Sequence, residues 1–403
     1  MHRMLRCSPQ ILALAFLGIA VVPASPILAQ NSDQPTQTQT DSGSTSTTTV
    51  SPDQQTTHKT LHDRLAVRLR LGDGVRQWRP TRRQLGINYA PGGSDASAPG
   101  TFQFIVDRMK LRHYLTLTAP YMHYLPKDAY PVVDPTYHGD YDGQVPAIIK
   151  PGRPGSDLDV DAAVDQVANA VQSDPVTTHI ILPLKTKPQD VTAADLTGID
   201  SRIGYFVTHF NPGDVGRTQT VRKAISIIDG HVLEPGAIFS VNQVVGERTA
   251  ARGFGIGHVF VDGKMEKEVG GGMCQVATTL FNASMLADLK IVERFQHVRT
   301  IPYVDPGRDA TVWFGTKDFK IQNDTTAPLY ISYTTTYSRA IVALYGKGTP
   351  GRKVVLVNHY RELGPRHFTG VFYRVVHEPD NTVHRDKPYY SDYQWTPALD
   401  YTR

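Results

Sequence analysis

The sequence has 403 residues, which exceeds the usual size of one domain, so we expect two domains with tails. The formal net charge is only +4, and Lys and Arg are not clustered with aromatic residues, so we expect no nucleic-acid partner. No apolar run reaches the roughly 18–20 residues that a membrane-spanning helix needs, so the mature chain is expected to lack a transmembrane span.

Residues 1–29 have the pattern of a signal peptide. Arg3 and Arg6 provide a positive start, Ile11–Val22 is apolar and uncharged, and Ala29 is a plausible last residue before cleavage. A short membrane anchor is the alternative, but the apolar run is too short to span a bilayer comfortably. We therefore expect an exported protein, extracellular or associated with the cell wall.

The next segment, residues 30–58, consists almost entirely of Gln, Thr, Ser, Asp and Pro. Such a composition cannot bury enough apolar surface to offset its conformational entropy. It predicts a disordered linker between the signal peptide and the folded part.

Residues 59–200 predict a first small α+β module. Val67–Trp78 alternates apolar and polar residues around Gly72-Asp73-Gly74, which indicates a hairpin. Thr81 is expected to cap a short helix that ends at Gly86. Further along, apolar residues from Val160 to Val171 recur on one face of a helix, with Asp157 or Asp159 as its cap, and a short strand follows.

The second region, residues 201–348, combines helices with a later run of strands, and a β-rich extension follows at 349–403. Together with the first module, this pattern predicts an α+β fold. The segment from Gly246 to Gly272 is expected to be a loop. The predicted helices are Thr220–Ile228 and Gln275–Leu289, and the predicted strands are Tyr205–Phe210, Ala237–Val241, Ile291–Val304, Ala310–Phe314, Phe319–Gln322, Leu329–Thr334 and Ala340–Tyr345, with a last hairpin of Val371–Val376 and Val383–Tyr389.

Only two cysteines occur, and cleavage of the signal peptide would remove Cys7. Cys274 then has no partner for an intramolecular disulfide, so it is either a buried small residue or a thiol kept for its reactivity. It follows three glycines at the predicted start of a helix, where unpaired N–H groups and the helix dipole favour a thiolate. Gly272 gives the backbone freedom, and the N–H of Gln275 can receive a developing oxyanion.

A thiolate nucleophile also needs a base and a group that orients the base. His297 lies in a segment with a strand pattern, and Asp309 precedes the next predicted strand. We therefore predict a triad of Cys274, His297 and Asp309. The alternatives are that His297 is a hydrogen-bonded structural residue and that Asp309 only closes a turn.

Several arginines can recognise carboxylates through two parallel hydrogen bonds, which suits a peptide ligand. The candidates are Arg248, Arg294 and Arg308, with solvated surface positions as the plainer interpretation. Histidines and cysteines show no ligand spacing, so we predict neither a metal site nor a cofactor.

Between Gly204 and Tyr333 the sequence resembles a VanW domain, named for a protein encoded in some vancomycin-resistance clusters. The resemblance is carried by Pro235-Gly236, Phe239-Ser240-Val241-Asn242, Val245-Gly246-Glu247-Arg248-Thr249, Gly270-Gly271-Gly272-Met273-Cys274-Gln275, Thr278-Thr279-Leu280-Phe281-Asn282-Ala283, Ile291-Val292-Glu293-Arg294 with His297, and Asp309-Ala310-Thr311-Val312. Met273 and Val298 depart from the residues usual in that family.

Residues 59–200 resemble the module, named for peptidoglycan binding, that often precedes VanW domains. Trp78, Leu85-Gly86 and the unit Pro151–Leu196 carry this looser resemblance. It implies recognition of cell-wall polymer as the partner, either peptidoglycan or its peptide stem.

The VanW resemblance implies no particular reaction. The order of Cys, His and Asp is similar to that of papain-like and transglutaminase-like enzymes, an analogy that favours acyl transfer or amide hydrolysis. The alternative is a non-catalytic peptidoglycan-binding or scaffolding protein with a structural Cys274, and a third interpretation is a redox-sensing thiol.

Overall fold

A computed structural model describes residues 63–394, except 64, 92–101, 140–142, 174–176 and 262–263. The predicted signal peptide and linker lie outside the described residues, as do positions 395–403. The structure combines helices with several small, mostly antiparallel sheets, which confirms the predicted α+β class. Within the described residues, no helix is both long enough and apolar enough to cross a membrane.

The first region contains the predicted hairpin. Strand β1 (Arg70–Gly72) pairs antiparallel with β2 (Gln77–Trp78) and parallel with β8 (His179–Ile181). The other elements here are β3 (Ile87–Pro91), β4 (Phe102–Val106), α2 (Arg108–Thr118), the 3-10 helix η1 (Ala119–Met122), β7 (Gly155–Leu158), α3 (Val160–Ser173) and β9 (Leu184–Lys187).

The predicted amphipathic helix is α3, with Val164, Val167 and Val171 buried in the core of this region. Asp159 caps it by accepting a hydrogen bond from the N–H of Ala162 at 3.2 Å. The short helix predicted after Thr81 is wrong. Thr81 does form a reciprocal cap with Gln84, but only turns follow, because Gly86 takes φ +72° and the chain enters β3.

The largest sheet has six antiparallel strands in the order β11-β17-β18-β10-β6-β5. The strands are β5 (Tyr130–Val133), β6 (Val145–Lys150), β10 (Ser201–His209), β11 (His231–Leu233), β17 (Leu329–Thr335) and β18 (Arg339–Gly346). Because β5 and β6 precede the boundary expected at residue 200, the sheet draws on both regions. Two separately folding modules therefore stay a prediction.

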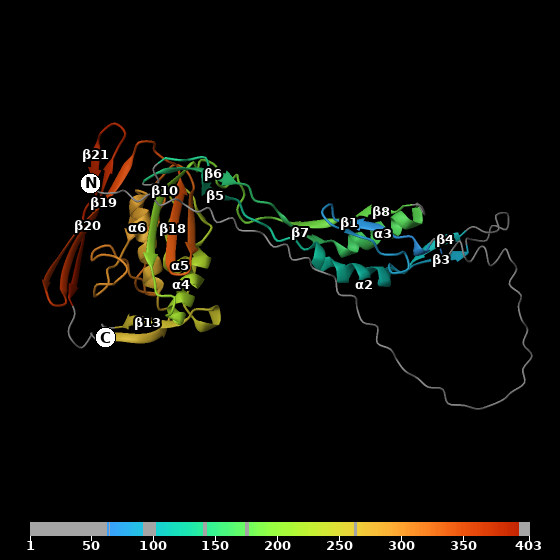
Figure 1. Ribbon diagram of the computed structural model, residues 1–403, viewed down its shortest axis with the longest axis horizontal. Helices are drawn as coiled ribbons and strands as arrows, with labels where there is room; N and C mark the ends of the chain where they lie inside the picture. Colours follow the sequence, from blue (N-terminus) through green and yellow to red (C-terminus); the bar gives the residue numbers. More distant parts are fainter. Residues whose placement is uncertain are drawn as a thin grey trace, which may run out of the picture. The chain divides into compact units, whose positions relative to one another are not determined.

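Helices α4 (Val215–Ile228) and α6 (Met273–Leu286) pack beside this sheet (Figure 1). Every residue of α6 from Gln275 to Met285 is buried, so this helix forms the centre of the main core. Gly204 in β10 allows the close approach, since a Cβ there would lie 2.4 Å from the carbonyl oxygen of Ala283.

Smaller sheets surround this core. Strand β16 (Lys320–Gln322) pairs with both β12 (Ile238–Ser240) and β15 (Lys290–Glu293), and α5 (Val241–Val245) follows β12 directly. The expected hairpin near the C-terminus is confirmed, but it belongs to a four-stranded sheet made of β19 (Lys353–Gly364), β20 (His367–His377), β21 (Val383–Arg385) and β22 (Tyr389–Gln394).

The loop predicted from Gly246 to Gly272 is wrong in part. After the 3-10 helix η2 (Ala250–Arg252), it contains the hairpin of β13 (Ile256–Val261) and β14 (Lys264–Val269). The dipeptide Asp262-Gly263, a strong hairpin signal, is the pattern that predicts it.

The strands predicted at Ile291–Val304 and Ala310–Phe314 are also largely wrong. The first ends at Glu293, and the second is reduced to isolated bridges such as Phe295 with Thr311. Side chains of α6 hydrogen-bond to the backbone here in place of a neighbouring strand, so His297 and Asp309 lie on irregular segments.

Candidate active site

Cys274 occupies the first turn of α6 and is partly buried, whereas the residues on either side of it, Met273 and Gln275, are buried. The glycines before it are required by geometry. Gly270 and Gly272 have φ of +99° and +113°, and a Cβ on Gly271 would lie 2.5 Å from the backbone of Gly257. The chain therefore turns sharply against β13 and presents the thiol at the start of the helix.

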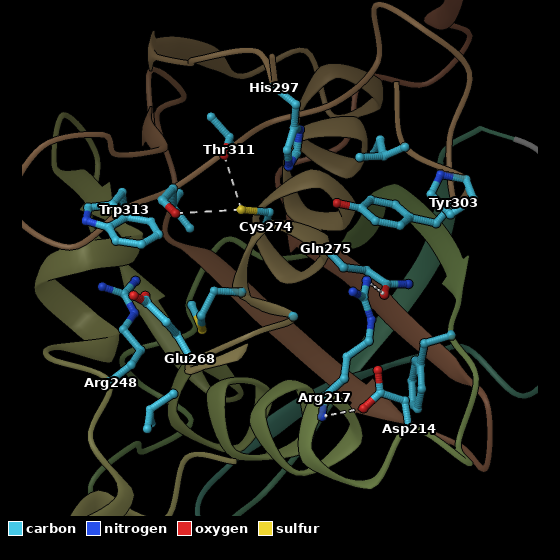
Figure 2. A pocket seen from close by; sticks show the side chains of 18 of the residues that line it. Asp214, Arg217, Arg248, Glu268, Cys274, Gln275, His297, Tyr303, Thr311 and Trp313 are labelled. Carbon is cyan, nitrogen blue, oxygen red and sulfur yellow. Dashed lines mark hydrogen bonds between the residues drawn. The ribbon is translucent and has the colours of Figure 1, made fainter. Parts of the chain in front are cut away.

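Two groups from the segment after Asp309 contact the sulfur. The Thr311 hydroxyl lies 3.2 Å from Sγ, and the Val312 carbonyl oxygen lies 3.6 Å from it (Figure 2). The imidazole of His297 faces the same sulfur, and its charge and hydrogen bonding are among the causes that lower the pKa of the thiol (Figure 2). The thiol is thus held between a hydroxyl and a titratable ring.

His297 is bound to Asp309 through its ring and its backbone. Nδ1 of His297 and its backbone nitrogen each lie 2.6 Å from Oδ2 of Asp309. The aspartate therefore fixes both the ring and the backbone of the histidine. The structure brings the three predicted residues into the order Cys274, His297, Asp309.

Asp309 itself is only 1% exposed and is surrounded by donors. The Arg294 guanidinium lies 3.0 Å from Oδ1 and also donates to the Asp309 carbonyl oxygen at 2.7 Å. The Tyr393 hydroxyl donates to Oδ1 and accepts a hydrogen bond from the N–H of Gly307. A buried carboxylate with this many partners remains ionised and fixed in position.

Side chains one and two turns along α6 hold the backbone on either side of Asp309. The Thr278 hydroxyl donates to the Ala310 carbonyl oxygen at 3.0 Å and accepts from the Ala310 N–H at 2.9 Å. The Asn282 amide donates to the Arg308 carbonyl oxygen at 2.8 Å. Since these residues lie on the face of α6 that begins at Cys274, one helix positions both ends of the triad.

Burial and charge act in opposite directions on the thiol and imidazole. Desolvation alone would raise the pKa of Cys274, but the charge and hydrogen bond of His297, with the Thr311 hydroxyl, lower it to about 7. Desolvation alone would lower the pKa of His297, but the Cys274 charge and the Asp309 hydrogen bond raise it to about 9. Between these values the pair exists as thiolate and imidazolium.

Asp309 shows the same balance. Burial would raise its pKa, but the hydrogen bond and charge of His297, the charge of Arg294 and the Tyr393 hydroxyl lower it to about 2. The carboxylate is therefore charged throughout the range in which the thiol titrates.

A pocket of about 750 Å³ opens over the thiol. Figure 2 shows Arg248, Glu268 and Trp313 on one side of Cys274, with Asp214, Arg217 and Tyr303 on the other. Trp313 and Phe314 are 40% and 47% exposed, so an aromatic surface is available to a ligand beside the sulfur. Cys274 is partly buried and lines this pocket, so a ligand in the pocket would lie beside the thiol.

The other predicted site residues take different places. Gly272 and Gln275 lie beside Cys274, but the Gln275 N–H donates to the Gly272 carbonyl oxygen at 3.1 Å, and its side chain binds Arg217 and β10. Arg294 supports Asp309, and Arg308 binds Asn282 at 3.0 Å, so neither lines the pocket. Arg248 does line it.

Sequence reasoning missed Thr311, Thr278, Asn282 and Tyr393. The first three lie inside the family motifs quoted above, and this position is the sequence feature that could have indicated a role at the site. Tyr393 carries no local signal, because its partner Asp309 is 84 positions away. In the described ranges, no group of three or more His, Cys, Asp or Glu side chains is arranged to hold a metal ion.

The fold and site therefore define an α+β protein with a linked Cys-His-Asp constellation at the start of a buried helix. Residues 216–345 match the family model described as "VanW like protein", so this part of the chain is a VanW-like domain. The match lies largely within the segment whose motifs predicted it.

Two curated relatives align with this part of the chain. An uncharacterized protein of Bacillus subtilis, YoaR, is 43% identical over 144 residues, covering 36% of this chain and 48% of the relative. The vancomycin B-type resistance protein VanW of Enterococcus faecalis is 28% identical over 135 residues, covering 32% and 49%. The chain thus spans about half the length of the curated relatives it matches. No solved structure shows a significant match.

Proposed function

We propose that this protein is exported to the cell wall and acts on the peptide stem of peptidoglycan through a covalent thioester at Cys274. The observation that carries the proposal is the Cys274–His297–Asp309 arrangement, in which the pKa of the thiol is lowered to about 7 inside a pocket. A structural cysteine in an apolar environment has a raised thiol pKa. The lowered pKa of Cys274 therefore favours a reactive thiol over a structural one.

The chemistry follows from the positions of these groups. The thiolate attacks an amide carbonyl carbon, forming a C–S bond, and the C–N bond breaks as the His297 imidazolium gives its proton to the leaving nitrogen. The products of this half-reaction are a thioester and a free amine. Water or a second amine then attacks the thioester, His297 accepts its proton, and the thiolate is released.

Water as the second nucleophile gives amide hydrolysis, and an amine gives acyl transfer. In both cases Asp309 stabilises the imidazolium and keeps Nδ1 of His297 directed away from the sulfur, at 2.6 Å from its own Oδ2. The three residues therefore have separate parts as nucleophile, acid–base and orienting group.

Two further observations support the location and substrate. The N-terminal sequence predicts a signal peptide, and one relative is a vancomycin resistance protein by name. Residues 59–200 carry the looser resemblance to a peptidoglycan-binding module, which we propose anchors the protein to the polymer.

The experiment is to incubate the full mature protein with purified muropeptides and to follow both products and protein by mass spectrometry. We expect released or exchanged amines and a protein adduct, both absent from Cys274→Ala. Cys274→Ser is the matched variant, which keeps the shape and should be at least about a hundredfold slower, because a hydroxyl is a far weaker nucleophile at this pH. Equal turnover by wild type and Cys274→Ala would refute the proposal.

A further inference from the structure

The guanidinium of Arg248 is buried and has no hydrogen-bond acceptor among the residues that the structure describes. It follows α5 and lines the pocket beside Cys274, on the side of Trp313 and Glu268 (Figure 2). Its Nε, Nη1 and Nη2 atoms are all buried, and none has a hydrogen-bond acceptor in the described structure. A guanidinium loses its hydration in such a position and is costly unless an anion replaces the water.

The neighbouring acidic groups act on this charge without forming a hydrogen bond to the guanidinium. The charges of Asp318 and Cys274 raise the pKa of Arg248 and so partly offset its burial, but the Asp318 carboxylate already accepts from the Ser240 hydroxyl at 2.5 Å and the Asn242 N–H at 2.9 Å. Glu247 and Glu268 line the pocket, yet neither forms a hydrogen bond with the guanidinium.

The surroundings of Arg248 hold it in place. A Cβ on Gly270 would lie 3.0 Å from Cβ of Arg248, so the glycine leaves room for the arginine stem. The Phe314 ring lies 5.5 Å from the guanidinium carbon, a cation–π contact. Burial lowers the pKa of Arg248 to about 10, so the side chain stays charged at neutral pH.

Two other arginines near the triad already have hydrogen-bond acceptors. Arg217 donates to the Gln275 side chain at 2.7 Å, and Arg294 forms the ion pair with Asp309 at 3.0 Å. Arg248 differs from both because it lines the pocket and none of its three guanidinium nitrogens has an acceptor among the described residues. That contrast indicates a ligand contact.

We propose that Arg248 binds a free carboxylate of the substrate and thereby places the neighbouring carbonyl over Cys274. This inference rests on the proposed function and deepens it, because it restricts the substrate to peptides that carry a carboxylate close to the reacting bond. The planar guanidinium fork matches a carboxylate through two parallel hydrogen bonds, which a lysine cannot reproduce.

The test compares two small alkylating reagents that differ in one charge. Iodoacetate carries a carboxylate and iodoacetamide does not, so the ratio of their rates at Cys274 reports anion binding beside the sulfur. Rates are measured at pH 8 on the full mature protein, with free cysteine as the reference. His297 attracts the anion in every variant, so the change on removing Arg248 is the decisive quantity.

We expect Arg248→Gln to lower the iodoacetate-to-iodoacetamide ratio about tenfold, the loss expected for a charge-assisted hydrogen bond. Arg222→Gln removes the same charge from the exposed face of α4 and should leave the ratio unchanged. Arg248→Lys keeps the charge but loses the fork, so we expect an intermediate ratio. If Arg248→Gln does not fold, the ratio measured for Arg248→Lys tests the carboxylate site by itself.

The outcomes separate the two proposals. Normal iodoacetamide labelling with an unchanged ratio in both Arg248 variants overturns the carboxylate site and leaves the nucleophile intact. Failure of folded wild type to react with either reagent overturns the thiolate proposal and the carboxylate site together. A ratio that falls in Arg222→Gln as strongly as in Arg248→Gln also contradicts a local site.

Discussion

Single atoms around Cys274 determine whether it is a small core residue or a nucleophile. The thiol lies 3.2 Å from the Thr311 hydroxyl, and its pKa is lowered by an imidazole that is bound to a carboxylate. A cysteine that only fills space needs none of these contacts. The half-buried position of Cys274 gives a ligand access to the sulfur.

Replacing Thr311 with valine keeps the shape of the side chain and removes its hydroxyl. Since that hydroxyl helps to lower the pKa of Cys274, we expect the pKa to rise and alkylation at pH 6 to slow about fivefold, equivalent to one hydrogen bond of about 1 kcal/mol. Alkylation rates measured against pH give the result. Thr316→Val, at an exposed position on the same segment, is the control and should behave like wild type.

Asp309→Asn removes the charge that orients His297. Because Asp309 raises the pKa of His297, we expect that pKa to fall and the pKa of Cys274 to rise. A rise of about one unit from about 7 would reduce the thiolate at pH 7 about fivefold. The Arg294 guanidinium would remain buried without its counter-ion, so unfolding in urea should require about 3–5 kcal/mol less. Asp305→Asn, at an exposed position nearby, should change neither quantity.

At this scale the sequence predicted the triad residues but not their support. Cys274, His297 and Asp309 were predictable because each has a residue type needed for the chemistry, near a helix or strand pattern. Arg294 illustrates the limit. An arginine can pair equally well with the carboxylate of a ligand or with the carboxylate of Asp309. Only the folded chain shows that Arg294 forms its ion pair with Asp309, at 3.0 Å.

Among the elements, α6 does most to organise the site. Its first turn carries Cys274, and Thr278 and Asn282 on the following turns hold the backbone beside Asp309. The helix was predicted to within a few residues because its apolar pattern is long. The hairpin of β13 and β14 was missed because its glycines and charges obscure the alternation expected of strands.

Gly272→Ala tests how tightly this element is fitted. A Cβ there would meet Val221 Cγ2 at 3.0 Å, and φ is +113°, so we expect the cost of a left-handed residue, about 1–2 kcal/mol, plus about 1 kcal/mol of overpacking. Gly236→Ala is the matched control, with φ of +80° and open space around its Cβ. Equal losses of unfolding free energy in the two variants would contradict the close fit at α6.

For the whole molecule, the site depends on chain beyond the part that matches the family model. That match ends at residue 345, yet Tyr393 and Ser391 in β22 bind Asp309 and Arg294. These contacts join positions more than 80 residues apart, and no local pattern predicts such a pairing. The C-terminal strands were predicted in part, but their contribution to the site was not.

Tyr393→Phe tests that contribution. It removes the hydroxyl that joins Gly307 to Asp309 and leaves a buried N–H unsatisfied, so we expect unfolding to require about 1–3 kcal/mol less and alkylation at pH 7 to slow severalfold. Tyr390→Phe on the same strand is the control, since Tyr390 is 73% exposed. An unaffected Tyr393→Phe would show that β22 does not support the site.

The ionised pair predicts how the whole protein responds to pH. The thiolate forms as pH rises through the pKa of Cys274, about 7, and the imidazolium is lost as pH rises through the pKa of His297, about 9. Turnover that needs both should therefore be bell-shaped, with its maximum between these values. A profile that rises steadily to pH 10 would contradict the requirement for the imidazolium.

The most direct measurement is the rate at which iodoacetamide alkylates Cys274 in the folded wild-type protein as a function of pH. We predict a rate that rises with a midpoint near pH 7 and reaches a plateau by about pH 8, because the thiolate is the reactive form. A midpoint at the value of a free thiol, about 8.5, or no labelling until the protein unfolds, would contradict the assignment of Cys274 as a nucleophile.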